Sequence, residues 1–349
     1  MSLQFITGGS GAGKSEYLSR LVCEESVRRP HDNFIVVVPE QYTMETQKKL
    51  VHMHSRKGIL NIDVVSFERL AYKVFEELGG GNRPVLDDTG KNLIVRRVLE
   101  KEKKKLDYFG SSIEKTGFVS ELKSVISELL QYGITPQQLG EIGENVKEKQ
   151  QLSAKLKDIR LVYKEFMAFL STNYITSEEI LDVLCGLVEK SKLIAGSEII
   201  FDGFTGFTPI QYKLMRLLLV YSKGIKISVT IDKKERPTGH EGWNNLFFMS
   251  KEMMNRLIAI CEEEGINVDD TVCVDRDINY RYEGAKDLAY LERNLFRYKG
   301  GVYTGTPENI RIYEGSNPKE ELQYIVSEIL QLTRKEGFRY RDIAVVTAD

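Results

Sequence analysis

Residues 7–17, TGGSGAGKSEY, combine several glycines with a lysine and a serine at a spacing that suits phosphate binding. Gly8, four further residues, and then Gly13, Lys14 and Ser15 follow the phosphate-loop pattern. Glycines let backbone N–H groups turn toward phosphate oxygens, the lysine can reach the β and γ phosphates, and the serine hydroxyl can hold magnesium. The predicted ATP and magnesium site comprises Gly8, Gly9, Ser10, Gly11, Ala12, Gly13, Lys14 and Ser15.

The residues around this loop predict the elements that would position it. Leu3–Thr7 is an apolar strand pattern, and Lys14–Glu25 is a helical pattern whose N-terminus adds positive charge at the phosphates. Asn33–Pro39 and Ile62–Ser66 are further strand patterns, and a helical pattern follows each of them. Strands that alternate with helices through short loops are typical of a parallel sheet. We therefore expect an α/β fold with a phosphate-loop NTPase (RecA-like) sheet.

A second pattern begins after the glycine-rich break at Gly79–Asn82. From Asp87 to about Lys192, apolar residues recur at helical spacing, which predicts a large all-helical insertion. Strand patterns return at Glu198–Asp202 and Ile225–Ile231. We expect a first α/β domain formed by residues 1–80 and 191–300, and a helical insertion formed by residues 81–190.

The last residues, 301–349, predict the start of another α/β domain. Ile310–Glu314 and Ile343–Thr347 are strand patterns on either side of a helical pattern at Pro318–Glu336. A strand needs neighbours with which to pair, and the sequence stops just after the second strand pattern. We therefore expect the chain to be a fragment of a longer protein.

Composition narrows the class of protein. A length of 349 residues exceeds one typical core, and a net charge of −2 argues against a globally basic nucleic-acid-binding protein, although not against a local basic groove. The cysteines form no CxxC pair, which predicts neither a zinc site nor a disulfide framework and fits a reduced, cytoplasmic setting. We find no secretion signal and no apolar run long enough to span a membrane. The basic run Lys101–Lys105 is interpreted first as a solvated helix face.

An acid at the end of a strand predicts the second half of the nucleotide site. Asp202 follows Ile199–Phe201 and has the form of the acid that positions magnesium in phosphate-loop enzymes. In hydrolysing members of this class a glutamate usually comes next and polarises the attacking water. Here the next residue is Gly203, which has no side chain that could accept a proton. We therefore predict nucleotide binding with weak or absent hydrolysis.

Residues 202–212, DGFTGFTPIQY, resemble the DEFQDTxxxQY stretch of superfamily 1 DNA helicases. Asp202, Phe204, Gln211 and Tyr212 match, whereas Gly203 stands where those helicases have glutamate. In the same order along the chain, PEQYTMETQ, ILNIDVVSFERLAYKVFEE and LDDTGK resemble the N-terminal part of the AddB family. AddB proteins are the B subunits of the bacterial ATP-dependent helicase/deoxyribonuclease AddAB.

The resemblance implies a role in processing double-stranded DNA breaks for recombinational repair. The implied partners are the motor subunit AddA, in a heterodimer, and single- and double-stranded DNA, on which AddB is implicated in reading the Chi sequence. The family's nuclease acids and iron–sulfur cysteines lie in the C-terminal part, beyond this chain, so no cysteine here is assigned to a cluster. The three regions would correspond to motor domain 1A, subdomain 1B and the start of domain 2A.

The resemblance also places candidate DNA contacts after two strands, where a motor domain meets a DNA strand. Tyr42 and Phe67 could each stack on a base or pack in the core, and the residues alone leave both options open. The candidate DNA-binding residues are Gln41, Tyr42, Thr43, Ser66, Phe67 and Arg69.

Three alternatives stay open. The chain could be an active DNA-dependent ATPase or helicase in which Glu40 replaces the missing glutamate. However, Val229–Lys233 keeps only the acid of the family's GDxxQ-like phosphate sensor. A small-molecule kinase would also begin with a phosphate loop but would not need the helical insertion. A structural partner with an empty pocket is disfavoured by the intact phosphate-loop residues.

Overall fold

The computed structural model describes residues 1–79, 84–115, 117–146, 149–236, 239, 242–295 and 301–347. It divides into two compact units, Met1–Tyr280 and Arg281–Asp349, and each is described by itself. The predicted break at Gly79–Asn82 lies mostly outside the described residues.

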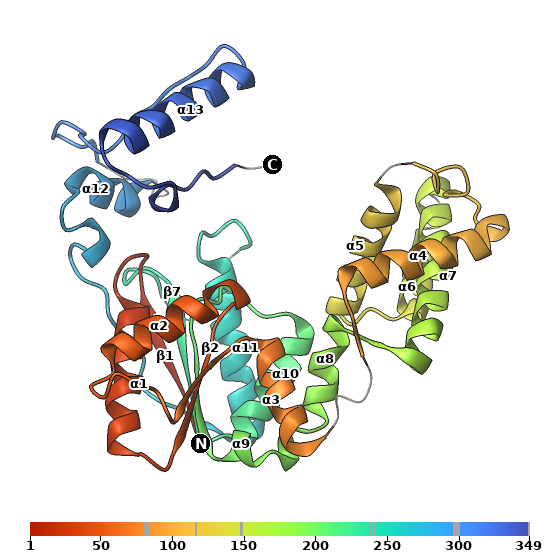
Figure 1. Ribbon diagram of the computed structural model, residues 1–349, viewed down its shortest axis with the longest axis horizontal. Coiled ribbons are helices and arrows are strands. Elements are labelled where there is room, and N and C mark those ends of the chain that lie inside the picture. The colour runs from red at the N-terminus through yellow and green to blue at the C-terminus, as the bar shows by residue number, and fades with distance from the viewer. Residues whose placement is uncertain are drawn as a thin grey trace. The chain divides into compact units, whose positions relative to one another are not determined.

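A seven-stranded sheet forms the centre of the first unit in the described part of the chain (Figure 1). Its order is β3-β2-β6-β7-β1, with the short strands β8 and β9 both beside β1, and every neighbouring pair is parallel. The strands are β1 (Ser2–Gly8), β2 (Asn33–Val37), β3 (Ile62–Val65), β6 (Ser197–Phe201), β7 (Gly224–Thr230), β8 (Asn267–Val268) and β9 (Val272–Cys273). The predicted α/β class with a mostly parallel sheet is confirmed.

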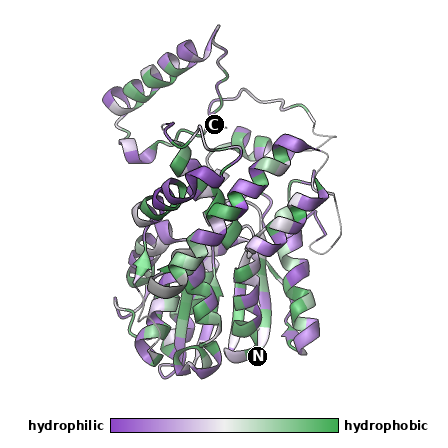
Figure 2. Cartoon of the chain, turned by 90° about the vertical axis from the view of Figure 1, so that its right-hand side faces the viewer, coloured by the Kyte–Doolittle hydropathy of each residue, from purple (hydrophilic) through white to green (hydrophobic). Residues whose placement is uncertain are grey.

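Helices cover both faces of this sheet, which explains why its strands are hydrophobic almost throughout (Figure 2). Successive strand residues point to opposite faces, so Phe5 and Ile35 join one buried cluster while Ile6 and Phe34 join another. One face carries α1 (Lys14–Arg28) and α2 (Thr43–Met53) (Figure 1). The other face carries α3 (Phe67–Leu78), α8 (Ser177–Cys185), α10 (Pro209–Tyr221) and α11 (Phe248–Glu264).

The helical part has a hydrophobic core of its own. Its helices are α4 (Asp88–Glu102), α5 (Phe118–Gln131), α6 (Pro136–Asn145) and α7 (Gln150–Asn173). Val95, Leu99, Ile126 and Phe166 are among the residues buried there. The chain enters and leaves through β4 (Val85–Leu86) and β5 (Ile175–Thr176), which pair in parallel. Shorter segments are η1 (Glu40–Tyr42), η2 (Lys103–Lys105), η3 (Val188–Lys190), α9 (Lys192–Ala195) and η4 (Tyr280–Tyr282).

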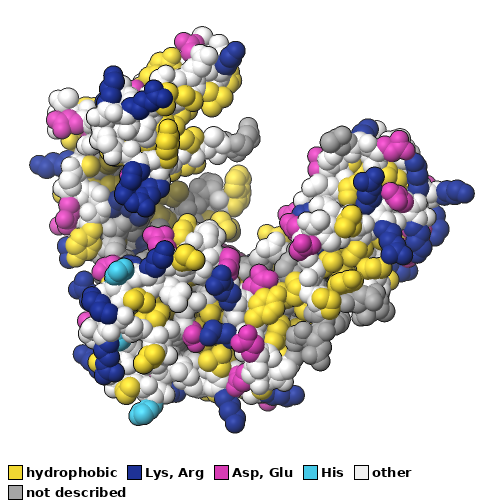
Figure 3. Space-filling view, in the orientation of Figure 1, with side chains coloured by type: hydrophobic (Ala, Val, Ile, Leu, Met, Phe, Trp, Pro, Cys, Tyr) yellow, Lys and Arg dark blue, Asp and Glu magenta, His cyan; other side chains and the backbone are white. Residues whose placement is uncertain are grey.

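Lys and Arg side chains gather at the outer end of the helical part (Figure 3). Within the basic run, Lys101 pairs with Glu165 at 2.9 Å and Lys103 pairs with Glu114 at 3.1 Å. Lys105 pairs with the buried carboxylate of Glu102 at 2.6 Å. These ion pairs neutralise much of the run locally, which agrees with its interpretation as a solvated helix face.

The second unit contains α12 (Lys286–Asn294), α13 (Pro318–Lys335) and η5 (Tyr340–Asp342). The predicted strands at Ile310–Glu314 and Ile343–Thr347 are not formed, and this correction has a simple physical reason. A strand is defined by its ladder, and in the described part of the chain no strand pairs with either segment. Their central side chains are accordingly exposed. No helix among the described residues combines the length and the hydrophobicity needed to cross a membrane.

Candidate nucleotide-binding site

The predicted phosphate loop, Gly8–Ser15, connects the end of β1 to the start of α1. Gly11 and Gly13 have φ angles of +75° and +97°, in the left-handed region that favours glycine. The Lys14 Nζ donates hydrogen bonds to the carbonyl oxygens of Gly8 and Gly9 at 2.8 and 2.9 Å. The lysine side chain therefore bends back over the loop, and its ammonium group is held beside the first residues of the loop. Ser15 begins the exposed face of α1.

Asp202 lies at the same edge of the sheet, directly after β6. Its N–H donates to the Val37 carbonyl oxygen at 3.0 Å, and its carboxylate accepts the Ser228 hydroxyl at 2.6 Å. Ser228 belongs to β7, which separates β6 from β1. Two strand spacings amount to about 10 Å, so Asp202 and the phosphate loop are too far apart for direct pairing.

This separation fits the way proteins hold magnesium. Magnesium keeps several waters and takes one or two protein oxygens together with substrate phosphates. Such an ion would need Ser15 and Asp202 but no further protein acids. In the described residues there is no group of three or more His, Cys, Asp or Glu side chains that could hold a metal. Magnesium binding by Ser15 and Asp202 stays a prediction, for which the hydroxyl and the carboxylate are both suitable oxygen ligands.

Gly203 lacks a side chain that could accept a proton, and its backbone conformation would also direct a side chain away from the phosphate loop. Its φ angle is +83°, and its N–H donates to the Ser228 hydroxyl oxygen at 3.3 Å. A Cβ at this position would lie 3.5 Å from the Cδ of Pro39. Pro39 follows β2, on the side of β6 opposite to β7 and β1. A side chain here would therefore start away from the phosphate loop.

The segment that follows β9 forms the other wall of the site. After β9, the carboxylate of Asp275 accepts the Gly9 N–H at 2.7 Å and the Lys233 N–H at 2.9 Å. Tyr280 packs against Gly13, where a Cβ would approach the tyrosine Cδ2 to 3.3 Å. The Arg276 guanidinium lies 3.7 Å from the centre of the Tyr280 ring.

A cavity of about 680 Å³ opens between this segment and α1. Its lining residues are Ala12, Gly13, Glu16, Tyr17, Arg20, Val274, Arg276 and Tyr280. Small-molecule sites typically enclose roughly 300–1,000 Å³ and combine aromatic surface with a few polar groups. Two tyrosine rings and two arginines beside a phosphate loop suit a planar base and a charged phosphate chain.

One signal in the sequence could have pointed to this wall. Val272–Val274 is a short apolar run that ends in Asp275, the same strand-then-acid form that identified Asp202. The strands involved have only two residues each, so they give no recognisable periodicity.

The candidate DNA-binding residues divide by exposure. Tyr42 is 48% exposed and Gln41 is also exposed, whereas Thr43 is buried and its hydroxyl donates to the Glu40 carbonyl oxygen at 2.9 Å. Arg69 is exposed and pairs with the Glu40 carboxylate at 2.8 Å. Hydrogen bonds from the Ser66 hydroxyl and then from Arg69 hold the pKa of Glu40 below its ordinary value.

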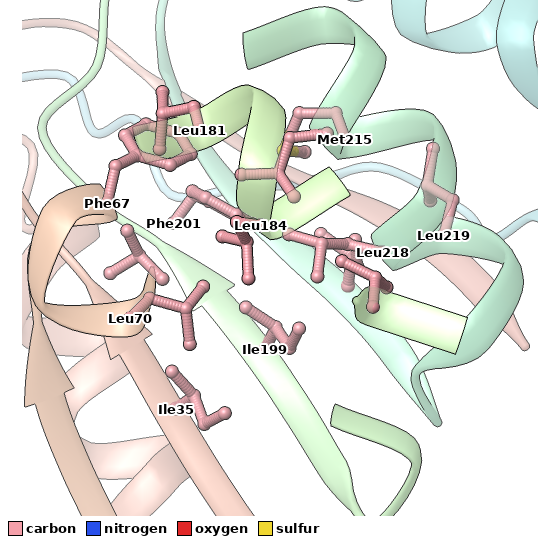
Figure 4. Close-up of a cluster of buried hydrophobic side chains, with 14 of the residues drawn as sticks. Ile35, Phe67, Leu70, Leu181, Leu184, Ile199, Phe201, Met215, Leu218 and Leu219 are labelled. Carbon is pink, nitrogen blue, oxygen red and sulfur yellow. The ribbon is translucent and has the colours of Figure 1, made fainter. Parts of the chain in front are cut away.

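Phe67 and Ser66 are buried. Phe67 points into the hydrophobic cluster beside Phe201 (Figure 4), with ring centres 5.7 Å apart. Phe204 and Phe207 also contact its ring. Ser66 caps α3 by accepting the Arg69 N–H at 3.3 Å. Stacking of Phe67 on a base would therefore require its ring to leave an aromatic cluster.

Part of the helicase-like stretch has a local structural role. Thr208 and Gln211 form a capping box at the start of α10, in which the Thr208 N–H donates to the Gln211 side chain at 2.9 Å. The Tyr212 ring packs against Phe207 and lies under the Arg256 guanidinium. These matching residues therefore have clear roles in the fold of this chain.

Comparisons with known proteins agree with the sequence pattern. The family model described as "ADDB, N-terminal" matches residues 5–292. The chain is 43% identical over 99% of its length to the B subunit of the ATP-dependent helicase/deoxyribonuclease of Lachnoclostridium phytofermentans, of which it covers 30%. Proteins of the same description from Caldanaerobacter subterraneus and Clostridium perfringens are 36% and 31% identical over the whole chain, again over 30% of their own length.

The chain thus spans about 30% of the length of the curated relatives that it matches. The family model covers well over half of the chain and includes the phosphate loop, Asp202 and Asp275. The chain belongs to the AddB N-terminal family.

Proposed function

We propose that this chain is the nucleotide-binding, helicase-like part of the AddB component of an ATP-dependent helicase/deoxyribonuclease. It binds ATP with magnesium through a phosphate-loop NTPase fold and hydrolyses ATP weakly or not at all. It acts with the motor subunit AddA, on single- and double-stranded DNA, in the processing of DNA breaks for recombinational repair.

The observation that carries the nucleotide-binding proposal is the phosphate loop and its adjoining cavity. The loop turns at two left-handed glycines, and Lys14 is held at its mouth. Tyr280 and Arg276 lie beside it and supply a ring face and a positive charge. The triphosphate would lie along the loop and the start of α1, where N–H groups and the helix dipole favour anions.

Weak hydrolysis is supported by Gly203 and its surroundings. The position lacks a general base, and its backbone directs any side chain toward Pro39. The alternative is an active DNA-dependent ATPase in which Glu40 acts as the base. The surroundings of Glu40 disfavour this alternative, because the Glu40 carboxylate is already paired with Arg69. A depressed pKa also makes Glu40 a weaker proton acceptor.

The role in a helicase/deoxyribonuclease is supported by the names of the relatives, each of which is the B subunit of such an enzyme. Under this proposal, residues 1–80 and 191–300 form motor domain 1A, residues 81–190 form subdomain 1B, and residues 301–349 begin domain 2A. The exposed Gln41, Tyr42 and Arg69 are then the first residues to test for DNA contact.

Calorimetric titration with ATP and ADP, with and without magnesium, tests nucleotide binding directly. Lys14→Ala should weaken ATP binding by roughly 10- to 100-fold, because a hydrogen bond to a charged group contributes about 1.5–3 kcal/mol. Lys48→Ala, at an exposed position on α2, is the matched control and should bind like the unsubstituted chain. Equal binding by the Lys14 variant would overturn the proposed site.

Phosphate release in the presence of single-stranded DNA tests the second half of the proposal. We expect no more release from the unsubstituted chain than from Lys14→Ala. Release well above that background would favour the active ATPase. Glu40→Gln would then show whether Glu40 is the base.

A further inference from the structure

We propose that Asp275 is a positioning residue that couples the phosphate loop to the loop after β7, so that nucleotide binding is transmitted to Trp243. This inference rests on the proposed nucleotide-binding function. The inference concerns how a structural change at the phosphate loop reaches the turn that contains Trp243. Asp275 is not proposed to contact a phosphate.

The coupling begins with the two oxygens of one carboxylate. Oδ1 of Asp275 accepts the N–H of Gly9, and Oδ2 accepts the N–H of Lys233. Gly9 follows β1 and Lys233 follows β7, so the carboxylate joins two loops from neighbouring parallel strands. The Ile231 N–H also donates to the Gly8 carbonyl oxygen at 3.2 Å. The two loops therefore have fixed positions relative to each other at two points.

The loop after β7 is in turn fixed to the start of α11. Glu235 pairs at 2.7 Å with Lys251, whose side chain is 2% exposed. The Ser250 hydroxyl donates to the Thr230 carbonyl oxygen at 2.8 Å. A movement of Lys233 is therefore passed to the first turn of α11 through a partly buried ion pair.

Trp243 lies in the turn that leads into this helix. The Asn245 N–H donates to the Gly242 carbonyl oxygen at 2.9 Å, and the Phe248 N–H donates to the Asn245 carbonyl oxygen at 3.0 Å. Trp243 is 85% exposed and is the single tryptophan of the chain. Its fluorescence therefore reports on this turn without interference from any other tryptophan.

A bound triphosphate has a physical reason to act on Asp275. The carboxylate is hydrogen-bonded to Gly9, within the loop that would carry several negative charges. Like charges at this range repel, and the phosphates compete for the same N–H groups of the loop. The interaction of Asp275 with Gly9 thus differs between the free and the bound loop, which is the differential contact that coupling requires.

Asp275→Asn separates coupling from folding, because asparagine keeps the shape of the side chain but has one acceptor oxygen where the carboxylate has two. It can accept the N–H of Gly9 or that of Lys233, and no longer both. Asp277→Asn is the matched control, since Asp277 pairs with the Lys233 ammonium at 3.0 Å, whereas Asp275 accepts the Lys233 backbone N–H.

The experiment is ATP titration of the 349-residue chain, followed by Trp243 fluorescence and, separately, by calorimetry. We expect the fluorescence to change with the same midpoint as calorimetric binding in the unsubstituted chain and in Asp277→Asn. Asp275→Asn should bind ATP at least as tightly as the unsubstituted chain, because it removes the carboxylate's repulsion of the phosphates and its competition for the loop N–H groups. At saturating ATP it should show no fluorescence change.

Three results would overturn the inference. No calorimetric binding by the unsubstituted chain would defeat the proposed function and this inference together. Binding without any Trp243 response would defeat this inference alone, as would a full response from Asp275→Asn.

If that variant does not fold, hydrogen exchange of the unsubstituted chain decides. ATP should alter exchange at residues 231–235 as well as 8–15, and a change confined to 8–15 would refute the coupling.

Discussion

Replacement of Gly203 tests two features of this position separately. One is the missing side chain, and the other is the left-handed backbone conformation, which disfavours any residue other than glycine. A residue other than glycine in a left-handed conformation costs about 1–3 kcal/mol. Alanine recovers about 0.4–1 kcal/mol through the lower entropy of the unfolded chain. The added Cβ meets Pro39 at an ordinary contact distance of 3.5 Å, so no steric penalty is added.

Gly203→Ala should therefore lower the free energy of unfolding by about 1–2 kcal/mol, or about 1–3 °C in melting temperature. Circular dichroism during heating measures this loss. Gly206→Ala is the matched control in the same loop, because Gly206 lies outside the left-handed region and its Cβ would contact only the end of Met249 at 3.6 Å. The control should be at least as stable as the unsubstituted chain.

Gly203→Glu restores the residue found in the helicases, and we expect it to restore no ATP hydrolysis. Its side chain leaves the backbone toward Pro39, on the far side of β6 from the phosphate loop. Phosphate release well above that of Lys14→Ala would refute this reasoning. So would a Gly203→Ala variant as stable as the unsubstituted chain.

Three further predictions concern the pocket, the aromatic cluster and one buried acid. Tyr280→Ala should weaken ATP binding by roughly fivefold, or about 1 kcal/mol of aromatic contact, whereas Tyr280→Phe should not; calorimetry measures both. Phe67→Ala should lower the free energy of unfolding by about 3–5 kcal/mol in denaturant titrations, whereas Tyr42→Ala, on the surface, should change it by less than about 0.5 kcal/mol. Burial raises the pKa of Glu198, but hydrogen bonds from Lys226 and Arg29 outweigh burial and leave the pKa below its ordinary value. Its ionised form therefore stabilises the fold above the unfolded-state pKa, and this stabilisation is lost as the pH falls through the depressed folded-state pKa. Glu198→Gln should accordingly make stability less dependent on pH in that acidic range, and an unchanged pH dependence in thermal melts would contradict the ion-pair assignment.

Regular elements of the first unit were predictable because each carries a periodic apolar pattern. β2 and β3 are nearly continuous apolar runs, and a helix follows each of them, as the sequence predicted. Gly8–Ser15 and Asp202 were identified for a different reason, since phosphate and magnesium binding demand fixed residue types at fixed spacing, and their role stays a prediction. A run of closely spaced glycines and an acid that follows an apolar strand can both be recognised from the amino-acid sequence alone.

The opposite wall of the site was not predictable in the same way. Asp275 reaches Gly9 across 266 residues of sequence, and the strands before it are too short to show a pattern. Phe67 shows a different limit. An aromatic residue after a strand suits a base platform or a core equally well, and only the contacts with Phe201 and Phe204 distinguish the two.

The short parallel pair of β4 with β5 has a consequence for how this part of the family can change. Because Val85–Leu86 and Ile175–Thr176 are hydrogen-bonded to each other as a separate two-stranded sheet, the chain enters and leaves the helical part at one point. The described helices between them have a hydrophobic core of their own. Helices there can lengthen, shrink or be exchanged without altering the register of the central strands. A protein engineer could therefore replace the helical segment at this pair while leaving the central parallel sheet unchanged.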